Sequence, residues 1–235
     1  MALPLVNSSR YTTTIPSTGI EVDYRPYLVK EEKILMVALE SKNEIAITKA
    51  VKDVISACVL SEIDIENLAM FDLEYLFLKL RAKSVGEVAE IKLKCTECEH
   101  ANDYSVNLDE LEVKGIGEQS NVIKITDSVG ITMRYPSVSD LDGIKENEMQ
   151  SIDGVMKLIL ACMVNIFDDD NVYACKDETT KNLQDFLDSL NSSQFQEIAK
   201  FLQEIPAITE TINFNCTSCN HENELELKGL QSFFS

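Results

Sequence analysis

The sequence predicts an α+β fold in which a helix-rich body carries short antiparallel hairpins. Several segments place apolar residues at helical spacing, whereas others are short strand-like runs bounded by turn residues. Two Cys-x-x-Cys pairs, Cys95/Cys98 and Cys216/Cys219, are each flanked by strand-like runs. Two such pairs can fill the four corners of a tetrahedral thiolate site, which usually holds zinc. The predicted fold is therefore a helix-rich α+β body with a split zinc-ribbon-like four-cysteine site.

The N-terminal part is expected to form a hairpin followed by three helices. Residues 11–15 and 20–24 are typical of strands around a turn at residues 16–19. The first helix should open at Glu31 and Glu32, and the third should have Asp72 as its N-cap and stop at Gly86. The apolar positions that mark the three helices are Ile34, Leu35, Ala38 and Leu39; Ile47, Ala50, Val51, Val54, Ile55 and Cys58; and Leu73, Leu76, Phe77 and Leu80.

The middle of the chain is expected to begin with strands and continue with helices. Residues 122–125 and 131–135 are typical of a hairpin. Residues 154–167 are apolar nearly all round, which predicts a buried central helix. Two shorter amphipathic helices should follow, over residues 183–190 and 195–205, before Pro206. These elements form an insertion between the two cysteine pairs.

The cysteine pairs lie in a short internal repeat. I-K-L-K-C-T-E-C-E-H-A-N from Ile91 and I-N-F-N-C-T-S-C-N-H-E-N from Ile212 share Ile, Cys, Thr, Cys, His and Asn in register. Residues 99–215 separate the pairs, far more than the roughly 15–20 residues of an ordinary zinc ribbon. We therefore predict one structural zinc ion per chain, bound between the two repeats. Its predicted ligands are Cys95, Cys98, Cys216 and Cys219.

Two alternatives to this metal site stay open at the level of sequence. The cysteine pairs could be unrelated redox or surface pairs that never meet, although neither pair follows a strand at the start of a helix, as thioredoxin-like chemistry expects. One histidine could also replace a cysteine ligand. His100 and His221 are the only histidines, and with four thiolates present we expect them to be outer-sphere or surface groups.

The domain organisation follows from the position of the repeat. Residues 1–90 are expected to form an N-terminal β-hairpin plus helices. Residues 91–115 and 207–235 should be the two halves of the zinc-ribbon-like unit, and residues 116–206 the inserted hairpin and helical region.

Composition argues against several classes of partner. The formal net charge of −19 repels nucleic-acid phosphates and anionic membranes, and no Lys/Arg cluster offers a local exception. No segment reaches the roughly 18 apolar residues of a membrane span, and the N-terminus does not have the pattern of a secretory signal. Seven cysteines without such a signal fit a reducing compartment. The three cysteines outside the repeat, expected to be free thiols, are Cys58, Cys162 and Cys175.

The chain is expected not to be an enzyme and to have no small-molecule substrate. Both histidines adjoin the cysteine pairs, and the sequence has neither a Gly-rich phosphate loop nor a nucleophile elbow. Asp168, Asp169 and Asp170 lack the alternating ligands of a calcium loop, so we expect a solvated loop between helices. A carboxylate-based hydrolase stays open among the 40 acidic residues, but no particular pair is indicated.

Several strings together resemble one protein family. They are P-S-T-G (16–19), Y-R-P-Y (24–27), K-E-E-K-I-L (30–35), F-D-L-E-Y-L-F (71–77), L-R-A-K-S-V-G-E (80–87), F-L-Q-E-I-P (201–206) and G-L-Q-S-F-F (229–234). With the two cysteine pairs, their order and spacing are similar to the baseplate hub and hub-assembly proteins of T-even-like contractile-tailed bacteriophages. The likeness covers most of the chain and is weakest across residues 99–150.

The resemblance implies a structural or assembly component of the central baseplate hub. Its partners would be other phage tail or baseplate proteins, and possible self-association stays open. It would be located in the virion baseplate or in an assembly intermediate in the host cytoplasm. The alternative is a zinc-ribbon regulatory or nucleic-acid accessory protein in the host cytoplasm, which the acidic charge disfavours.

Two groups of residues are candidates for partner contacts. The charged residues Arg81, Lys83 and Glu87 precede the first cysteine pair, where they either face a partner or offset the dipole at the end of a helix. The second group is apolar and lies at the C-terminus: Leu230, Phe233 and Phe234. These side chains either dock on a partner or pack on their own domain.

Overall fold

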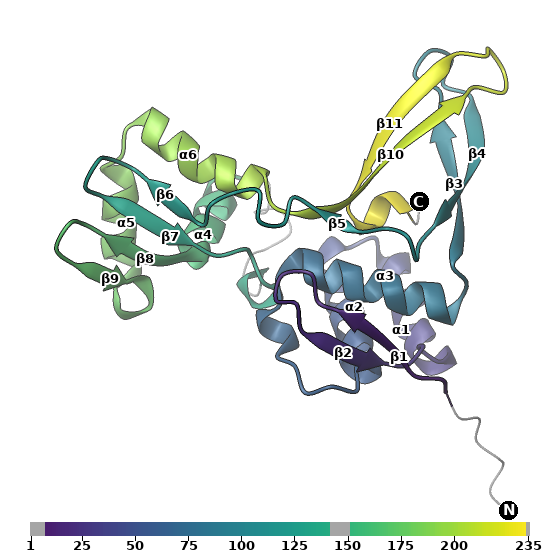
Figure 1. The fold of residues 1–235 in the computed structure, drawn as a ribbon, viewed down its shortest axis with the longest axis horizontal. Coiled ribbons are helices and arrows are strands. Elements are labelled where there is room, and N and C mark those ends of the chain that lie inside the picture. The colour runs from purple at the N-terminus through teal and green to yellow at the C-terminus, as the bar shows by residue number, and fades with distance from the viewer. Residues whose placement is uncertain (1–7, 142–150, 234–235) are drawn as a thin grey trace, which may run out of the picture. The chain divides into compact units, whose positions relative to one another are not determined.

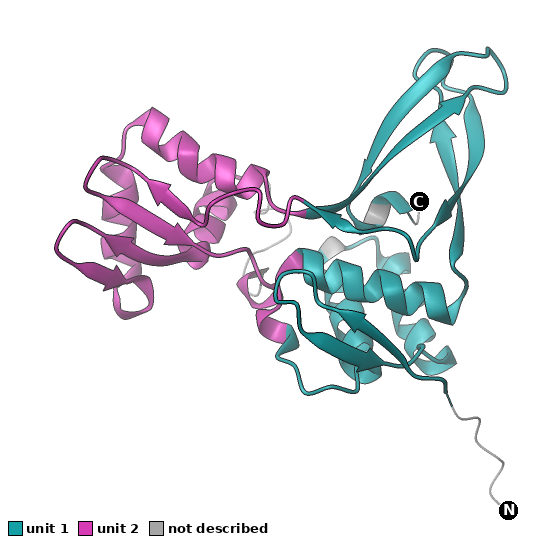
Figure 2. Cartoon of the chain, viewed as in Figure 1, with its two compact units in different colours: residues 1–65, 71–114, 207–235 teal, residues 66–70, 115–206 magenta. Residues whose placement is uncertain are grey.

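The computed structural model describes residues 8–141 and 151–233 of the chain (Figure 1). It contains helices and short antiparallel sheets, which confirms the predicted α+β class. The chain divides into two compact units, coloured separately in Figure 2. Unit 1 contains residues 1–65, 71–114 and 207–235, and unit 2 contains residues 66–70 and 115–206.

Unit 1 combines a three-helix part with two long hairpins. Its helices are α1 (Val29–Ser41), α2 (Glu44–Cys58) and α3 (Met70–Ser84, which begins at the boundary with unit 2), and a short 3₁₀ segment, η5 (Leu230–Phe233), lies near the C-terminus. Its strands are β1 (Tyr11–Thr14), β2 (Glu21–Tyr24), β3 (Val88–Lys94), β4 (Ala101–Asn107), β5 (Val113–Lys114), β10 (Ala207–Asn215) and β11 (Glu222–Lys228). The three antiparallel sheets have the orders β1-β2, β3-β4 and β11-β10-β5.

The predicted N-terminal hairpin is confirmed, but Asp72 has a different role from the one expected. It lies within the first turn of α3 rather than at the N-cap, and its side chain is completely buried. Its carboxylate accepts hydrogen bonds from the backbone N–H of Ser17, at 2.9 Å, and from the Ser17 hydroxyl. A buried carboxylate needs such donors, and here they fix the β1–β2 turn to α3.

Helix α1 has a narrower buried face than its sequence pattern predicted. Leu35 and Ala38 are buried as expected, but Ile34 and Leu39 are 46% and 60% exposed. The start of the helix is fixed by Glu31, whose buried carboxylate accepts hydrogen bonds from the Arg25 guanidinium and the Leu28 backbone N–H, at 2.9 and 2.8 Å. Because α1 is apolar beyond its packed face, the helix presents apolar side chains to solvent.

The core of unit 1 joins α3 to both long hairpins. The fully buried Phe233 of η5 belongs to this core, and Leu230 packs against it. For these two residues, packing on their own domain is therefore confirmed, whereas Phe234 lies outside the described residues. The buried members of the cluster are Leu78, Ala82, Ala89, Ile91, Leu93, Val106, Leu108, Leu111, Ile208, Ile212 and Phe233.

Strand β5 marks the place where the chain leaves unit 1 for the insertion. It pairs antiparallel with the start of β10, with Lys114 opposite Ala207 and Val113 opposite Ile208. The residues on either side of the insertion are thus neighbours in one sheet.

Over its described residues, unit 2 is a four-stranded antiparallel sheet with three helices. The strands are β6 (Val122–Lys124), β7 (Gly130–Met133), β8 (Met163–Phe167) and β9 (Val172–Ala174), in the order β6-β7-β8-β9. The helices are α4 (Ile152–Cys162), α5 (Thr180–Asp188) and α6 (Ser192–Gln203), with short 3₁₀ segments η2 (Val138–Leu141) and η4 (Cys175–Asp177). Strand side chains such as Ile131 share a buried cluster with helix side chains such as Ile159 and Ile198.

The predicted central helix over residues 154–167 is confirmed up to Cys162 and wrong for residues 163–167. Helix α4 ends at Cys162, and the chain continues directly as β8, which pairs with β7 on one side and β9 on the other. The apolar run suits either structure, and pairing with two strands outweighs helical periodicity for a segment ending in Ile166 and Phe167. The aspartates at 168–170 consequently form a turn between strands, not between helices. The Asp168 side chain accepts the backbone N–H groups of Asp170 and Asn171 there.

An ion pair between a partly exposed arginine and a buried aspartate fixes η2 of unit 2 beside α4. The Arg134 guanidinium donates two hydrogen bonds of 2.6 Å to Asp140, which also accepts from the backbone and hydroxyl of Ser137. Burial by itself raises the pKa of Asp140, but these donors outweigh it and hold the pKa below its ordinary value.

The cysteines outside the repeat are buried, as expected of core thiols. Cys58 and Cys162 are completely buried, and burial raises the pKa of Cys58 to about 11 and that of Cys162 to about 12. Because a thiolate is the reactive form of cysteine, both side chains are chemically quiet.

Candidate metal centre

The turns of the two long hairpins bring all four cysteines of the repeat together. Cys95 and Cys98 lie between β3 and β4, and Cys216 and Cys219 lie between β10 and β11. Figure 1 shows the ends of these hairpins side by side. The four sulfur atoms lie within 4.8 Å of one another, with Cys95 and Cys219 3.7 Å apart and Cys98 and Cys216 3.6 Å apart.

These sulfur separations suit a metal tetrahedron. With metal–sulfur bonds of about 2.3 Å, the sulfur atoms of a regular tetrahedron are about 3.8 Å apart. A disulfide would instead require about 2.05 Å between sulfurs. The four potential ligands are all cysteine sulfurs. Four thiolates fill the tetrahedral coordination of zinc, so this set of ligands fits a closed structural zinc site.

Both knuckles have the same backbone geometry, which explains how the repeat turns its sulfurs inward. The backbone N–H groups of Cys95 and Cys216 donate to the carbonyls of His100 and His221, each at 2.9 Å. The residue after each second cysteine, Glu99 or Asn220, has a left-handed backbone with φ near 57° and 58°. The matching conformation shows that the sequence repeat is also a structural repeat.

The cluster contains thiols whose pKa is lowered and thiols whose pKa is raised. Backbone N–H groups, first that of Cys219, outweigh burial and lower the pKa of Cys216 to about 6. The pKa of Cys95 is also lowered, because backbone and Asn223 donors exceed the effect of burial. For Cys219 the N–H of His221 lowers the pKa, but hydrogen bonding with the neighbouring thiols and burial raise it to about 12. Four adjacent thiols cannot all ionise easily unless a cation compensates them.

The histidine side chains stay outside the cluster. His100 and His221 are both exposed, and the group of potential ligands consists of the four cysteines. The repeat also contains Thr96, Asn102, Thr217 and Asn223, to which the sequence assigned no role. Their recurrence in register was the available signal, and both asparagines are buried beside the thiols.

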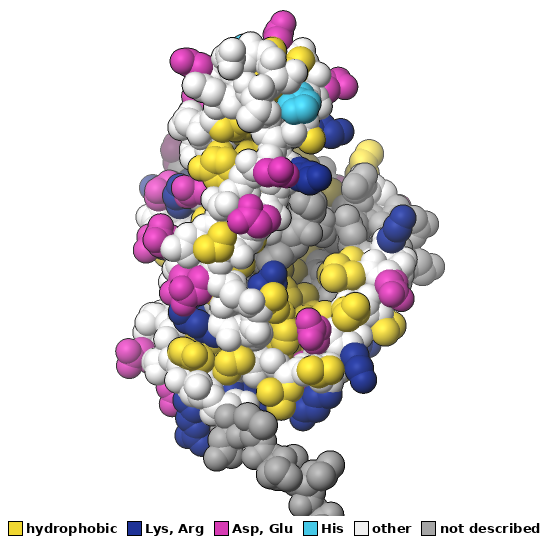
Figure 3. All heavy atoms as spheres, turned by 90° about the vertical axis from the view of Figure 1, so that its right-hand side faces the viewer, with side chains coloured by type: hydrophobic (Ala, Val, Ile, Leu, Met, Phe, Trp, Pro, Cys, Tyr) yellow, Lys and Arg dark blue, Asp and Glu magenta, His cyan; other side chains and the backbone are white. Residues whose placement is uncertain are grey.

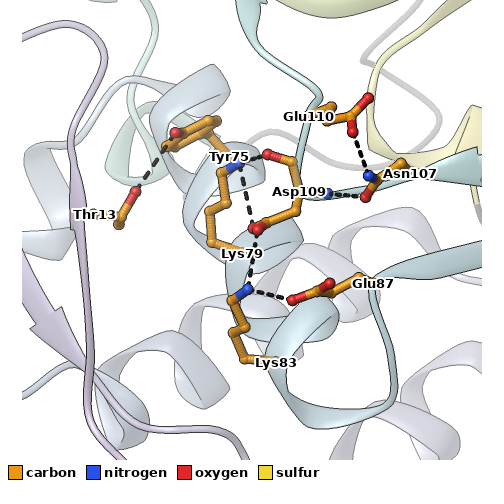
Figure 4. Close-up of polar contacts among 8 residues, drawn as sticks. All are labelled: Thr13, Tyr75, Lys79, Lys83, Glu87, Asn107, Asp109 and Glu110. Atoms are coloured by element: carbon orange, nitrogen blue, oxygen red, sulfur yellow. Dashed lines mark hydrogen bonds and ion pairs between the residues drawn. The ribbon is translucent and has the colours of Figure 1, made fainter.

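The charged string before the first knuckle is largely engaged within the chain (Figure 4). Lys83 donates to Glu87 at 2.5 Å and to Asp109 at 2.9 Å, and these carboxylates raise its pKa. Arg81 donates to the Gly86 carbonyl at 3.5 Å. These contacts at the end of α3 favour the helix-terminus alternative, and the partner-facing role of the string stays a prediction.

The fold and the cluster define a strongly acidic α+β protein with paired cysteine knuckles and a large insertion between them. The sequence model of the family described as T4 bacteriophage base plate protein matches residues 8–235, and the chain belongs to this family. Comparisons with curated proteins and with solved structures each found no significant match. Within the described ranges, none of the helices has the length and apolar character needed to cross a membrane.

Proposed function

We propose that this chain is a structural or assembly component of the central hub of a phage tail baseplate. The observation that carries the proposal is the match to the base plate family over residues 8–235. The hub is the finer part of the proposal, and its support is the resemblance of the N- and C-terminal strings to hub and hub-assembly proteins. In this role the chain binds other tail proteins, catalyses no reaction, and is located in the virion baseplate or in an assembly intermediate.

The second part of the proposal is one structural zinc ion per chain. The ligands would be Cys95, Cys98, Cys216 and Cys219, and the assignment is supported by their sulfur separations and by the matching backbone geometry of the two knuckles. Four protein thiolates leave no open coordination position, so the ion would stabilise rather than catalyse. It would join two hairpins that are distant in sequence, and its binding free energy would contribute directly to folding.

An exposed apolar face on α1 supports a role in protein–protein contacts. Val29 and Val37 are 66% and 68% exposed, and an apolar groove of about 320 Å³ lies between this helix, α2 and α3. Figure 3 shows hydrophobic side chains gathered near the lower end of the face it draws. Groove residues include Leu35, Met36 and Leu39. Exposed apolar side chains on a helix that also lines an apolar groove are typical of a docking site.

Mass spectrometry of purified particles and of immature tail intermediates tests the baseplate role. The chain is expected in one or both fractions together with other tail proteins, and its absence from both would refute the role. Met36→Glu on α1, at a groove residue that is 56% exposed, should reduce co-purification, whereas Val172→Glu on β9, a residue that is 70% exposed, is the matched control. Equal recovery of both variants would exclude the α1 face as the contact surface.

Elemental analysis of freshly purified protein tests the metal. One zinc per chain is expected, and Cys→Ser at any of the four positions should release it and lower the stability. A double variant with one cysteine changed in each pair should lose much less than the sum of the two single losses, because the first change already destroys the site. A folded, metal-free wild-type chain would refute this part of the proposal. Retention of zinc without the second knuckle would refute the split site.

The regulatory or nucleic-acid alternative receives no support from the described surface. A protein of net charge −19 binds nucleic acid poorly, and the family match favours the baseplate role.

A further inference from the structure

Two buried asparagines occupy equivalent positions beside the knuckles, one from each hairpin. Asn102 lies on β4 and Asn223 on β11, and they are only 5% and 4% exposed. A buried amide must satisfy both an oxygen and an NH₂ group. The question is where each amide finds its partners.

Each amide oxygen accepts hydrogen bonds from the knuckle of the other hairpin. The Asn102 oxygen accepts from the backbone N–H and the hydroxyl of Thr217, at 2.8 and 2.9 Å. The Asn223 oxygen accepts from the same two groups of Thr96, at the same two distances. Each threonine is the first of the two residues between the cysteines of its pair, so the amides fix the knuckles across the hairpin interface.

Each NH₂ group faces a buried thiol of the opposite hairpin. Asn102 donates to Cys216 Sγ at 3.8 Å, and Asn223 donates to Cys95 Sγ at 3.6 Å. The same NH₂ groups donate to the backbone carbonyls of His100 and His221, at 2.9 and 3.0 Å. The reverse amide orientation would place oxygen against these carbonyls and NH₂ against the threonine N–H, so the network fixes the orientation.

We propose that Asn102 and Asn223 are reciprocal positioning residues of the metal centre, each holding the opposite knuckle and donating a hydrogen bond to one of its thiolates. This inference depends on the proposed zinc site. Hydrogen bonds to metal ligands orient them and stabilise their charge, and their loss typically lowers metal affinity by 10- to 100-fold. The crossed arrangement makes neither knuckle complete without the other hairpin. It also explains why Thr and Asn recur with Cys in both repeats.

The test uses the full-length zinc-loaded protein and the variants Asn102→Asp and Asn223→Asp. Aspartate keeps the size and the accepting oxygen but replaces the N–H donor with a second oxygen that faces the thiolate. We expect transfer of zinc to a chromogenic chelator to accelerate by about 10-fold or more in each variant. Asn213→Asp makes the same chemical change at an exposed position of β10 and should release zinc at the wild-type rate.

Cobalt substitution supplies a readout that general loosening of the fold does not produce. A thiolate that loses its N–H donor gives up an electron more easily, so the sulfur-to-cobalt charge-transfer band of each variant should move to longer wavelength. Thr96→Val is a milder variant that removes only the hydroxyl contact with Asn223, and it should release zinc several-fold faster than the wild type. It provides the test if the aspartate variants do not fold. Thr96→Ser retains the hydroxyl and should behave as wild type.

The possible failures are distinguishable. Zinc release and cobalt spectra identical to those of Asn213→Asp would overturn the positioning role while leaving the zinc site in place. A wild-type chain that binds neither zinc nor cobalt would overturn both proposals.

Discussion

Replacing Phe233 by alanine tests whether the C-terminal segment belongs to the core of unit 1. Phe233 is completely buried and shares a cluster with Leu78 of α3 and Ile208 of β10. Truncation removes the transfer free energy of the ring and leaves a cavity, which together cost about 3–5 kcal/mol. Since native proteins are stable by only about 5–15 kcal/mol, the variant should lose a large part of the stability of unit 1.

Tyrosine fluorescence during urea unfolding is a suitable assay, because the chain has seven tyrosines and no tryptophan. Most of the tyrosines report on unit 1: Tyr11, Tyr24, Tyr27, Tyr75 and Tyr104. With a denaturant slope of about 2 kcal/mol per M, the expected loss lowers the urea midpoint by roughly 1.5–2.5 M.

Val88→Ala provides the control for this experiment. Val88 lies on β3 of the same unit and is 55% exposed, so its truncation should change the free energy of unfolding by no more than about 0.5 kcal/mol. If the free energy of unfolding of Phe233→Ala is within about 1 kcal/mol of the wild-type value, the C-terminal segment contributes little to the core and the reasoning is wrong.

Two further substitutions probe unit 2 by the same urea titration, with far-UV circular dichroism as the signal that monitors unfolding. Gly130→Ala should cost about 1–3 kcal/mol, because the new Cβ would overlap the Phe167 ring and lie 3.0 Å from the Ile123 carbonyl oxygen; an unchanged midpoint would contradict this packing. Asp140→Asn should cost about 2 kcal/mol at pH 7 by weakening the bonds from Arg134. The pKa of Asp140 is lowered in the folded state, so the contribution of this carboxylate to stability is complete above the ordinary pKa of about 3.9. The contribution is lost as the pH falls through the folded-state pKa. A difference in stability between wild type and variant that persists at lower pH would refute the assignment.

Local patterns predicted much of the fold because they are themselves local in origin. The α2 helix has apolar residues on one face over its whole length, and the β1–β2 hairpin is bounded by turn residues, so tertiary context changes neither. The cysteine cluster was predictable for another reason. Two copies of one unit with the same ligand spacing indicate a shared site whatever the length of chain between them.

The missed features depend on contacts between distant segments. The chain from Met163 to Phe167 becomes a strand because β7 and β9 offer hydrogen bonds on both sides, which no helical pattern reveals. Asp72 resembled an N-cap, but its acceptor oxygens bind Ser17 from another element. The roles of Asn102 and Asn223 were equally hidden, since each asparagine acts on the hairpin to which it does not belong.

The pairing of β5 with β10 has a consequence for how this chain can vary. Lys114 and Ala207 face each other across one rung of the sheet, so the segment between them departs and returns at nearly the same point. A departure and return at adjacent rungs let that segment grow, shrink or be exchanged without shifting the strands that lead to Cys216. The closure entropy of such a loop grows only slowly with its length. Inserted segments of unrelated sequence and length are therefore compatible at this position with the same paired knuckles.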